Sequence, residues 1–84
     1  MIRWDPAKSE KLKRERGVSF EEVLLGEFVR FVAHPRLPHQ GFALFRLRGY
    51  VWVVPFVREG GGYFLKTAYP SRRYTRMFGK ENSL

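Results

Sequence analysis

The sequence predicts a single α+β domain: two N-terminal helices packed on an antiparallel sheet of about four strands, with a short basic helix at the C-terminal end. Two helix-start patterns occur in the first 22 residues, and apolar segments typical of strands fill most of residues 28–69. The chain has 84 residues, of which 44% are hydrophobic. This length allows one core, so we expect one domain over residues 1–84.

The N-terminal region predicts an edge strand followed by a solvated helix. Residues 1–4 fit a short strand. Asp5 is a typical N-cap, and Pro6 is favoured at the first position of a helix. Residues 7–16 are rich in Lys, Glu and Arg, and Gly17 is a typical helix end. We therefore expect a helix over residues 7–16 with little apolar surface.

A capping box marks the second helix. Ser19 fits the N-cap, and Glu22 fits the third helical position, from which its carboxylate can reach back to the N-cap N–H. We expect this helix to run to about residue 27 and to offer Phe20, Val23 and Leu24 to the core.

After the second helix the apolar pattern becomes that of strands and turns. Arg48 and Gly49 fit a two-residue hairpin turn. Residues 59–62 are rich in glycine and fit a second turn. They do not fit a phosphate-binding loop, because the Lys-Ser/Thr continuation and a following helix are absent. Strands are therefore expected at residues 28–34, 42–48, 50–58 and 63–69, and a basic helix at residues 72–78.

The first hairpin predicts which residues share a face of the sheet. With Arg48 and Gly49 as the loop, Phe45 lies opposite Trp52, and opposed residues share a face. This aromatic face should carry the two N-terminal helices. Arg46 then lies on the other face.

Lys66 shares the face of Arg46 if the second turn also has an even number of residues, because Lys66 then lies opposite Pro55. On this register the two cations are two strands and four residues apart, roughly 16 Å. That separation suits a groove that follows a phosphate backbone better than a compact catalytic pair. A solvated lysine on an open sheet face is the alternative.

Charge and composition favour a polyanionic partner. Lys and Arg number 16 against 8 for Asp and Glu, which gives a formal net charge of +8. Cysteine is absent, so a disulfide framework is excluded. Neither a signal peptide nor an apolar segment of membrane-spanning length is visible, so we expect a cytoplasmic protein.

The C-terminal segment, residues 58–80, concentrates this charge. It holds six cations, interleaved tyrosines and one acid, Glu59. Cations neutralise phosphates, and aromatic rings stack on unpaired bases. A solvated basic surface with half-buried tyrosines is the alternative. The candidate RNA-binding residues are Arg58, Tyr63, Arg73, Tyr74, Arg76 and Lys80.

Three further positions are candidates for catalysis. His34 and His39 flank a proline-rich loop and are candidate acid and base groups, since histidine titrates near neutrality. Ordinary loop histidines are the favoured alternative, and no third ligand suggests a metal site. Ser71 fits the N-cap of the last helix, where Arg72 and Arg73 would form an anion site. The candidate catalytic residues are Lys66, Arg46, Arg72, His34 and His39.

Three segments carry a resemblance to a known family. Trp4-Asp5-Pro6-Ala7-Lys8 and Arg16-Gly17-Val18-Ser19-Phe20-Glu21-Glu22-Val23 resemble the N-terminal signature of BrnT-type toxins of bacterial type II toxin–antitoxin systems. Ser71-Arg72-Arg73-Tyr74-Thr75 is similar to that family's C-terminal segment. The match covers residues 2–27 well and residues 50–76 more loosely. Arg16 stands where the family usually has His.

The resemblance implies a RelE-like fold and a ribonuclease that cleaves RNA and inhibits translation. It implies a cleavage without metal or cofactor, in which a 2′-hydroxyl attacks the adjacent phosphate and cationic side chains stabilise the charge. It also implies inactivation by a cognate antitoxin encoded beside the toxin, in a hetero-oligomer, with a toxin homodimer as the other possible assembly. By position, Arg72 matches the family's segment.

Two other functional classes remain open from the residues alone. One is a basic RNA- or DNA-binding module without catalysis, which explains the charge equally well. The other is a protein-interaction domain for an acidic partner.

Overall fold

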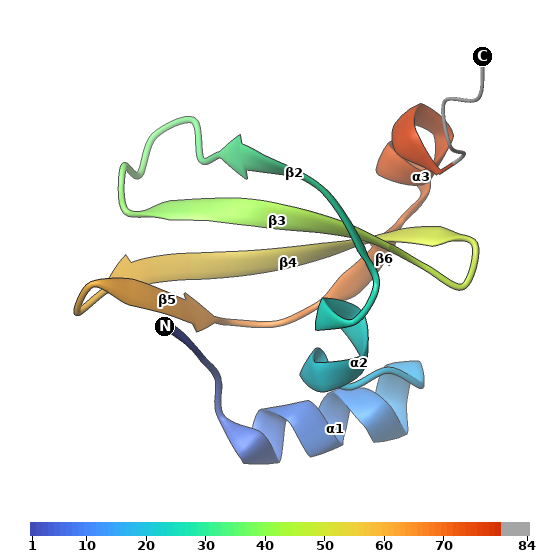
Figure 1. The fold of residues 1–84 in the computed structure, drawn as a ribbon, viewed down its shortest axis with the longest axis horizontal. Coiled ribbons are helices and arrows are strands. Elements are labelled where there is room, and N and C mark those ends of the chain that lie inside the picture. Colours follow the sequence, from blue (N-terminus) through green and yellow to red (C-terminus); the bar gives the residue numbers. More distant parts are fainter. Residues whose placement is uncertain (80–84) are drawn as a thin grey trace.

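A computed structural model of the chain describes residues 1–79, which form a six-stranded mixed sheet with three helices (Figure 1). The predicted α+β class is confirmed. No helix in this part of the chain is long and apolar enough to cross a membrane. The elements are β1 (Ile2–Arg3), α1 (Pro6–Arg16), α2 (Phe20–Leu24), β2 (Glu27–Ala33), β3 (Gln40–Leu47), β4 (Tyr50–Glu59), β5 (Gly62–Leu65), β6 (Tyr69–Ser71) and α3 (Arg72–Phe78).

The predicted helix caps are confirmed. The Asp5 carboxylate accepts a hydrogen bond from the Ala7 N–H at 3.0 Å, and α1 ends at Gly17, whose φ is 79°. The Ser19 hydroxyl accepts from the Glu22 N–H, and the Glu22 carboxylate accepts from the Ser19 N–H. These caps satisfy backbone groups that a helix leaves without partners.

The second helix is shorter than predicted. It ends at Leu24, and β2 begins at Glu27. Between them the backbone of Gly26 passes so close to β3 that a Cβ there would lie 2.5 Å from the Arg46 carbonyl oxygen. The chain turns into the sheet at this glycine, and a further helical turn is excluded.

The sheet has more strands than predicted, and one pairing is parallel. The strand order is β1-β5-β4-β3-β2, with β1 parallel to β5. The strand expected at residues 63–69 is divided: β5 pairs with the second half of β4 and β6 with its first half. The division falls at Ala68, which is buried and whose carbonyl accepts a hydrogen bond from the Arg16 guanidinium. This contact joins the segment between β5 and β6 to the end of α1.

The predicted register of the first hairpin is confirmed. Phe45 pairs with Trp52, and both belong to the core that α1 and α2 cover. The turn residues Arg48 and Gly49 have φ values of 54° and 83°, as a type I′ turn requires. Lys66 lies opposite Pro55, since its N–H donates to the Pro55 carbonyl at 2.9 Å.

The sheet therefore has two faces with separate apolar clusters. α1 and α2 lie on one side of the sheet, and α3 packs at the opposite side (Figure 1). On the α1/α2 face, Phe20 and Val23 are fully buried. On the α3 face, Tyr74 and Phe78 pack on a smaller cluster of buried residues, Leu44, Val51 and Val53.

Candidate nucleic-acid interface

Helix α3 is fixed to the sheet on one side and exposes arginines on the other. The Ser71 hydroxyl accepts from the Tyr74 N–H at 3.1 Å, so this serine is an N-cap, as predicted. The Thr75 hydroxyl accepts from the Val51 N–H at 2.8 Å and ties the helix to β4. The outward residues Arg72, Arg73 and Arg76 are exposed.

The three arginines have no carboxylate partner within residues 1–79. The ion pairs of this part of the chain use the cations Arg3, Lys13, Arg46 and Arg48. Arg73 makes a cation–π contact with the ring of Tyr74, 6.0 Å from its centroid. α3 contains no acidic residue, so no carboxylate of the helix itself offsets its positive charge.

The same face carries Lys66 and His34 beside the part of the sheet that α3 covers. Lys66 lies opposite Pro55, Pro55 pairs with Phe42 on β3, and the His34 ring lies 6.1 Å from the Phe42 ring. Lys66 is exposed, two strands from Phe42, or about 10 Å. A row of residues thus crosses the α3 face, with the Lys66 ammonium at one end and the His34 imidazole at the other.

One ring nitrogen of His34 accepts hydrogen bonds from the backbone of its own loop. Its Nδ1 accepts hydrogen bonds from the N–H groups of Arg36 and Leu37, at 3.1 and 3.0 Å. The neutral ring therefore carries its proton on Nε2 and can donate from there. In this state Nε2 can donate a hydrogen bond, but it can neither accept a proton nor act as a general acid, because only the imidazolium gives up a proton readily.

His39 is exposed in the same loop, and within residues 1–79 its ring makes no contact with that of His34. Its backbone carbonyl accepts from the Arg58 N–H at 2.7 Å. The structure thus does not form the two histidines into an acid–base pair.

Arg46 lies on the predicted face but holds other parts of the protein together. Its guanidinium makes two hydrogen bonds with the Glu27 carboxylate, at 3.0 and 2.9 Å, and also donates to the Phe78 carbonyl. These bonds join β3 to β2 and to the end of α3. The hydrogen bonds from Arg46 lower the pKa of Glu27.

Two of the predicted RNA-binding residues lie on the other face of the sheet, and a third falls outside the described residues. Arg58 and Tyr63 are opposed across β4 and β5, on the same face as Phe56 and Leu65. That face carries α1 and α2. Lys80 lies outside the part of the chain that the structure describes.

Arg30 also belongs to the candidate interface, although no sequence pattern predicted it. Its guanidinium lies over the Phe78 ring, 5.1 Å from the centroid. Pairing along β2 is irregular between Phe28 and Arg30, and this irregularity sets the face on which Arg30 lies. The pattern of residues 28–34 does not show where such a bulge occurs.

The candidate interface therefore consists of Arg30, Lys66, Arg72, Arg73 and Arg76, with Tyr74 and His34 beside them. Within residues 1–79, no three His, Asp or Glu side chains gather as metal ligands. Compared with known proteins, the chain matches no protein family, no curated protein and no solved structure.

Proposed function

We propose that this protein is the toxin component of a bacterial type II toxin–antitoxin system, a metal-independent endoribonuclease that acts in the cytoplasm and inhibits translation. The observation that carries the proposal is the set of cations on α3, which pair with no carboxylate within residues 1–79 and lie on a sheet face that also holds Lys66 and His34. The resemblance of residues 2–27 and 50–76 to BrnT-type toxins supplies the reaction class and the partner, a cognate antitoxin.

In the proposed reaction the RNA backbone lies along the α3 face. The 2′-oxygen of one nucleotide forms a bond to the adjacent phosphorus, and the bond to the 5′-oxygen of the next nucleotide breaks. The products are a 2′,3′-cyclic phosphate and a 5′-hydroxyl end. A base removes the 2′-hydroxyl proton, and an acid supplies a proton to the leaving oxygen.

The residues divide these roles by position and charge. Lys66 and Arg72 stabilise the extra negative charge of the five-coordinate phosphorus. Arg73 and Arg76 hold flanking phosphates, and Tyr74 offers an aromatic edge to a neighbouring base. His34 donates a hydrogen bond from its Nε2–H to a phosphate oxygen, His39 is the candidate base, and water supplies the proton for the leaving oxygen. The 2′-hydroxyl is an internal nucleophile, so the proposed chemistry requires no metal or cofactor.

A second candidate function is RNA binding without cleavage. It is favoured by the contacts of Arg46 and of His34 Nδ1, because both side chains have structural roles that account for their presence. In this case the α3 face binds the phosphate backbone through the same arginines and performs no chemistry.

Cleavage of a defined oligonucleotide separates the two functions. The substrate is an RNA of about 20 nucleotides, compared with the same sequence carrying 2′-O-methyl groups throughout, in buffer with EDTA. We expect the purified full chain to cut the RNA, to leave a cyclic phosphate end and to spare the methylated strand. Binding of both strands without cleavage of either would support the non-catalytic candidate and overturn the ribonuclease.

Matched substitutions then place the activity on the α3 face. Lys66→Ala and Arg72→Ala should each lower the cleavage rate by about 100-fold, which is typical for the loss of one group that stabilises a transition state. The controls are Lys11→Ala and Arg14→Ala, which remove the same charges from exposed positions on α1. Equal losses in the α1 variants would contradict this location of the site.

A further inference from the structure

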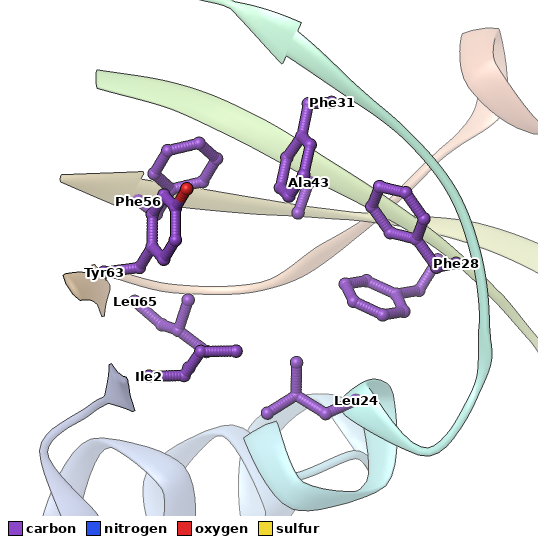
Figure 2. Close-up of a pocket in the computed structure, with 9 residues that line it drawn as sticks. Ile2, Leu24, Phe28, Phe31, Ala43, Phe56, Tyr63 and Leu65 are labelled. Atoms are coloured by element: carbon purple, nitrogen blue, oxygen red, sulfur yellow. The ribbon is translucent and has the colours of Figure 1, made fainter. Parts of the chain in front are cut away.

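A half-open apolar groove of about 470 Å³ lies on the α1/α2 face, away from the candidate RNA interface. Its lining side chains come from α2 and from β1, β2, β3, β4 and β5, and Figure 2 shows them around one space. Phe31 is 59% exposed and Phe28 is 47% exposed, which is unusual for adjacent aromatic residues of a monomer. The walls of the groove include Leu24, Phe28, Phe31, Phe56, Tyr63 and Leu65.

The groove is formed before any partner binds. Phe28 and Phe31 are three residues apart and would face opposite sides of a regular strand. The irregular pairing between Phe28 and Arg30 places both on the α1/α2 face, with their ring centroids 4.9 Å apart. Phe31 also contacts Phe56 edge to face, and Phe56 contacts Tyr63 at 5.2 Å. These ring contacts fix the walls of the groove.

One end of the groove carries polar donors. A second cavity of about 340 Å³ shares Phe31, Phe56 and Tyr63 with the first and reaches Arg58. Arg58 lies directly opposite Tyr63 across β4 and β5, so their side chains are neighbours. Within residues 1–79, the Arg58 guanidinium donates to the Pro38 carbonyl at 3.5 Å and pairs with no carboxylate, and no group bonds to the Tyr63 hydroxyl. Both donors suit a carboxylate.

We propose that this groove binds an amphipathic helix of an acidic partner protein. The apolar stripe of the helix lies on Phe28 and Phe31, and one carboxylate meets Arg58 and Tyr63. A stripe at positions i, i+3, i+4 and i+7 fits a groove of this kind. A second copy of the chain is disfavoured as the occupant, because each copy carries a net charge of +8. The inference rests on the groove and does not depend on ribonuclease activity.

Three synthetic peptides of about four helical turns test the proposal against the full chain. The first has a leucine stripe and glutamates elsewhere. The second keeps the stripe and replaces glutamate by glutamine. The third has the composition of the first in scrambled order, without a stripe. Fluorescence anisotropy should show the first binding at least about tenfold more tightly than the other two. Equal binding of the scrambled peptide would overturn the proposal, since charge alone would then account for affinity.

Substitutions in the protein locate the contact. Phe31→Ala should weaken binding of the first peptide by about tenfold, whereas Tyr50→Ala, an exposed aromatic outside the groove, should leave it unchanged. Arg58→Gln should weaken the glutamate peptide by about fivefold and the glutamine peptide by less than about twofold. Arg14→Gln on α1 removes the same charge elsewhere. Equal effects of the two arginine substitutions would contradict the carboxylate contact.

Two measurements use the unmodified protein, so their outcome does not depend on whether a variant folds. On addition of the first peptide, amide NMR shifts should change at Phe28, Phe31 and Tyr63 and remain constant along α3. Changes confined to α3 would overturn the location. Sedimentation velocity of the protein alone should show a monomer at micromolar concentration. A dimer that the first peptide dissociates would instead identify a second copy as the occupant.

Discussion

Arg46 and Glu27 form a two-point ion pair between β3 and β2, with nitrogen–oxygen distances of 3.0 and 2.9 Å. The same guanidinium donates to the Phe78 carbonyl at the end of α3. One side chain thus connects the edge strand, its neighbour and the helix that carries the candidate RNA-binding arginines. This places Arg46 as a positioning residue for the interface.

We predict that Arg46→Ala lowers the free energy of unfolding by about 1–3 kcal/mol, because the substitution removes a charged donor from the Phe78 carbonyl. It should also speed amide hydrogen exchange along α3. Glu27→Gln should have a smaller effect, since Arg46 keeps its bond to Phe78. Urea unfolding and hydrogen exchange measure both quantities. If the two variants lose equal stability and α3 exchange is unchanged, Arg46 does not anchor the helix.

The salt dependence of RNA affinity should report how many phosphate groups α3 contacts. Single substitution of Arg72, Arg73 or Arg76 by Ala should reduce the slope of log K against log salt by about 0.7, the value for one phosphate contact on a single strand. Arg58→Ala should leave the slope unchanged, because Arg58 lies on the opposite face. Filter binding of a single-stranded RNA at several salt concentrations gives the slopes. Equal slope changes for Arg58 and the α3 arginines would refute this division of the faces.

Ser9 is a buried polar residue that joins α1 to the start of α2. Its hydroxyl donates to the Glu21 carboxylate at 2.6 Å and accepts from the Phe20 N–H at 3.0 Å. Ser9→Ala leaves that buried N–H without a partner and should cost about 1–3 kcal/mol of unfolding free energy. Glu21→Gln should cost less, since the bond to Phe20 remains. Chemical denaturation of both variants tests the ranking, and the reverse order would contradict it.

The elements that the sequence predicts best are those fixed by contacts within a few residues. The caps at Asp5 and Ser19 and the turn at Arg48 depend on bonds or φ values at neighbouring positions. The division of the last strand coincides instead with a bond between Ala68 and Arg16, which are distant in sequence. No local pattern encodes such a contact.

The candidate site was predicted to a similar extent. The face of Lys66 follows from the length of two turns and is correct. The same register places Arg58 and Tyr63 on the face opposite to Lys66. The alternation of side chains along the two strands is sufficient to predict this difference. The contacts of Arg46 with Glu27 and Phe78 were not predictable, because they depend on where α3 packs.

Gly26 should be intolerant of any side chain. Its Cβ position lies 2.5 Å from the Arg46 carbonyl oxygen, which belongs to the backbone of β3. Gly26→Ala must therefore shift either α2 or the strand, at a cost of about 1–3 kcal/mol. The neighbouring Leu25→Ala, at a position 85% exposed, is the control and should be close to neutral. Thermal unfolding compares the two, and equal melting temperatures would show that the junction can relax.

Glu22 should make stability depend on pH in the acidic range. The Ser19 N–H and then Lys13 lower the pKa of this carboxyl from 4.5 to about 2 in the folded protein. Folding therefore favours the charged form, so the contribution of Glu22 is fully present above about pH 4.5 and is lost as pH falls toward 2. Glu22→Gln lacks this titration. The difference in unfolding free energy between the wild type and Glu22→Gln should therefore decrease between pH 5 and pH 2, with Glu10→Gln on α1 as the control. A difference that stays constant over this range would mean that the capping box does not hold the charged carboxylate.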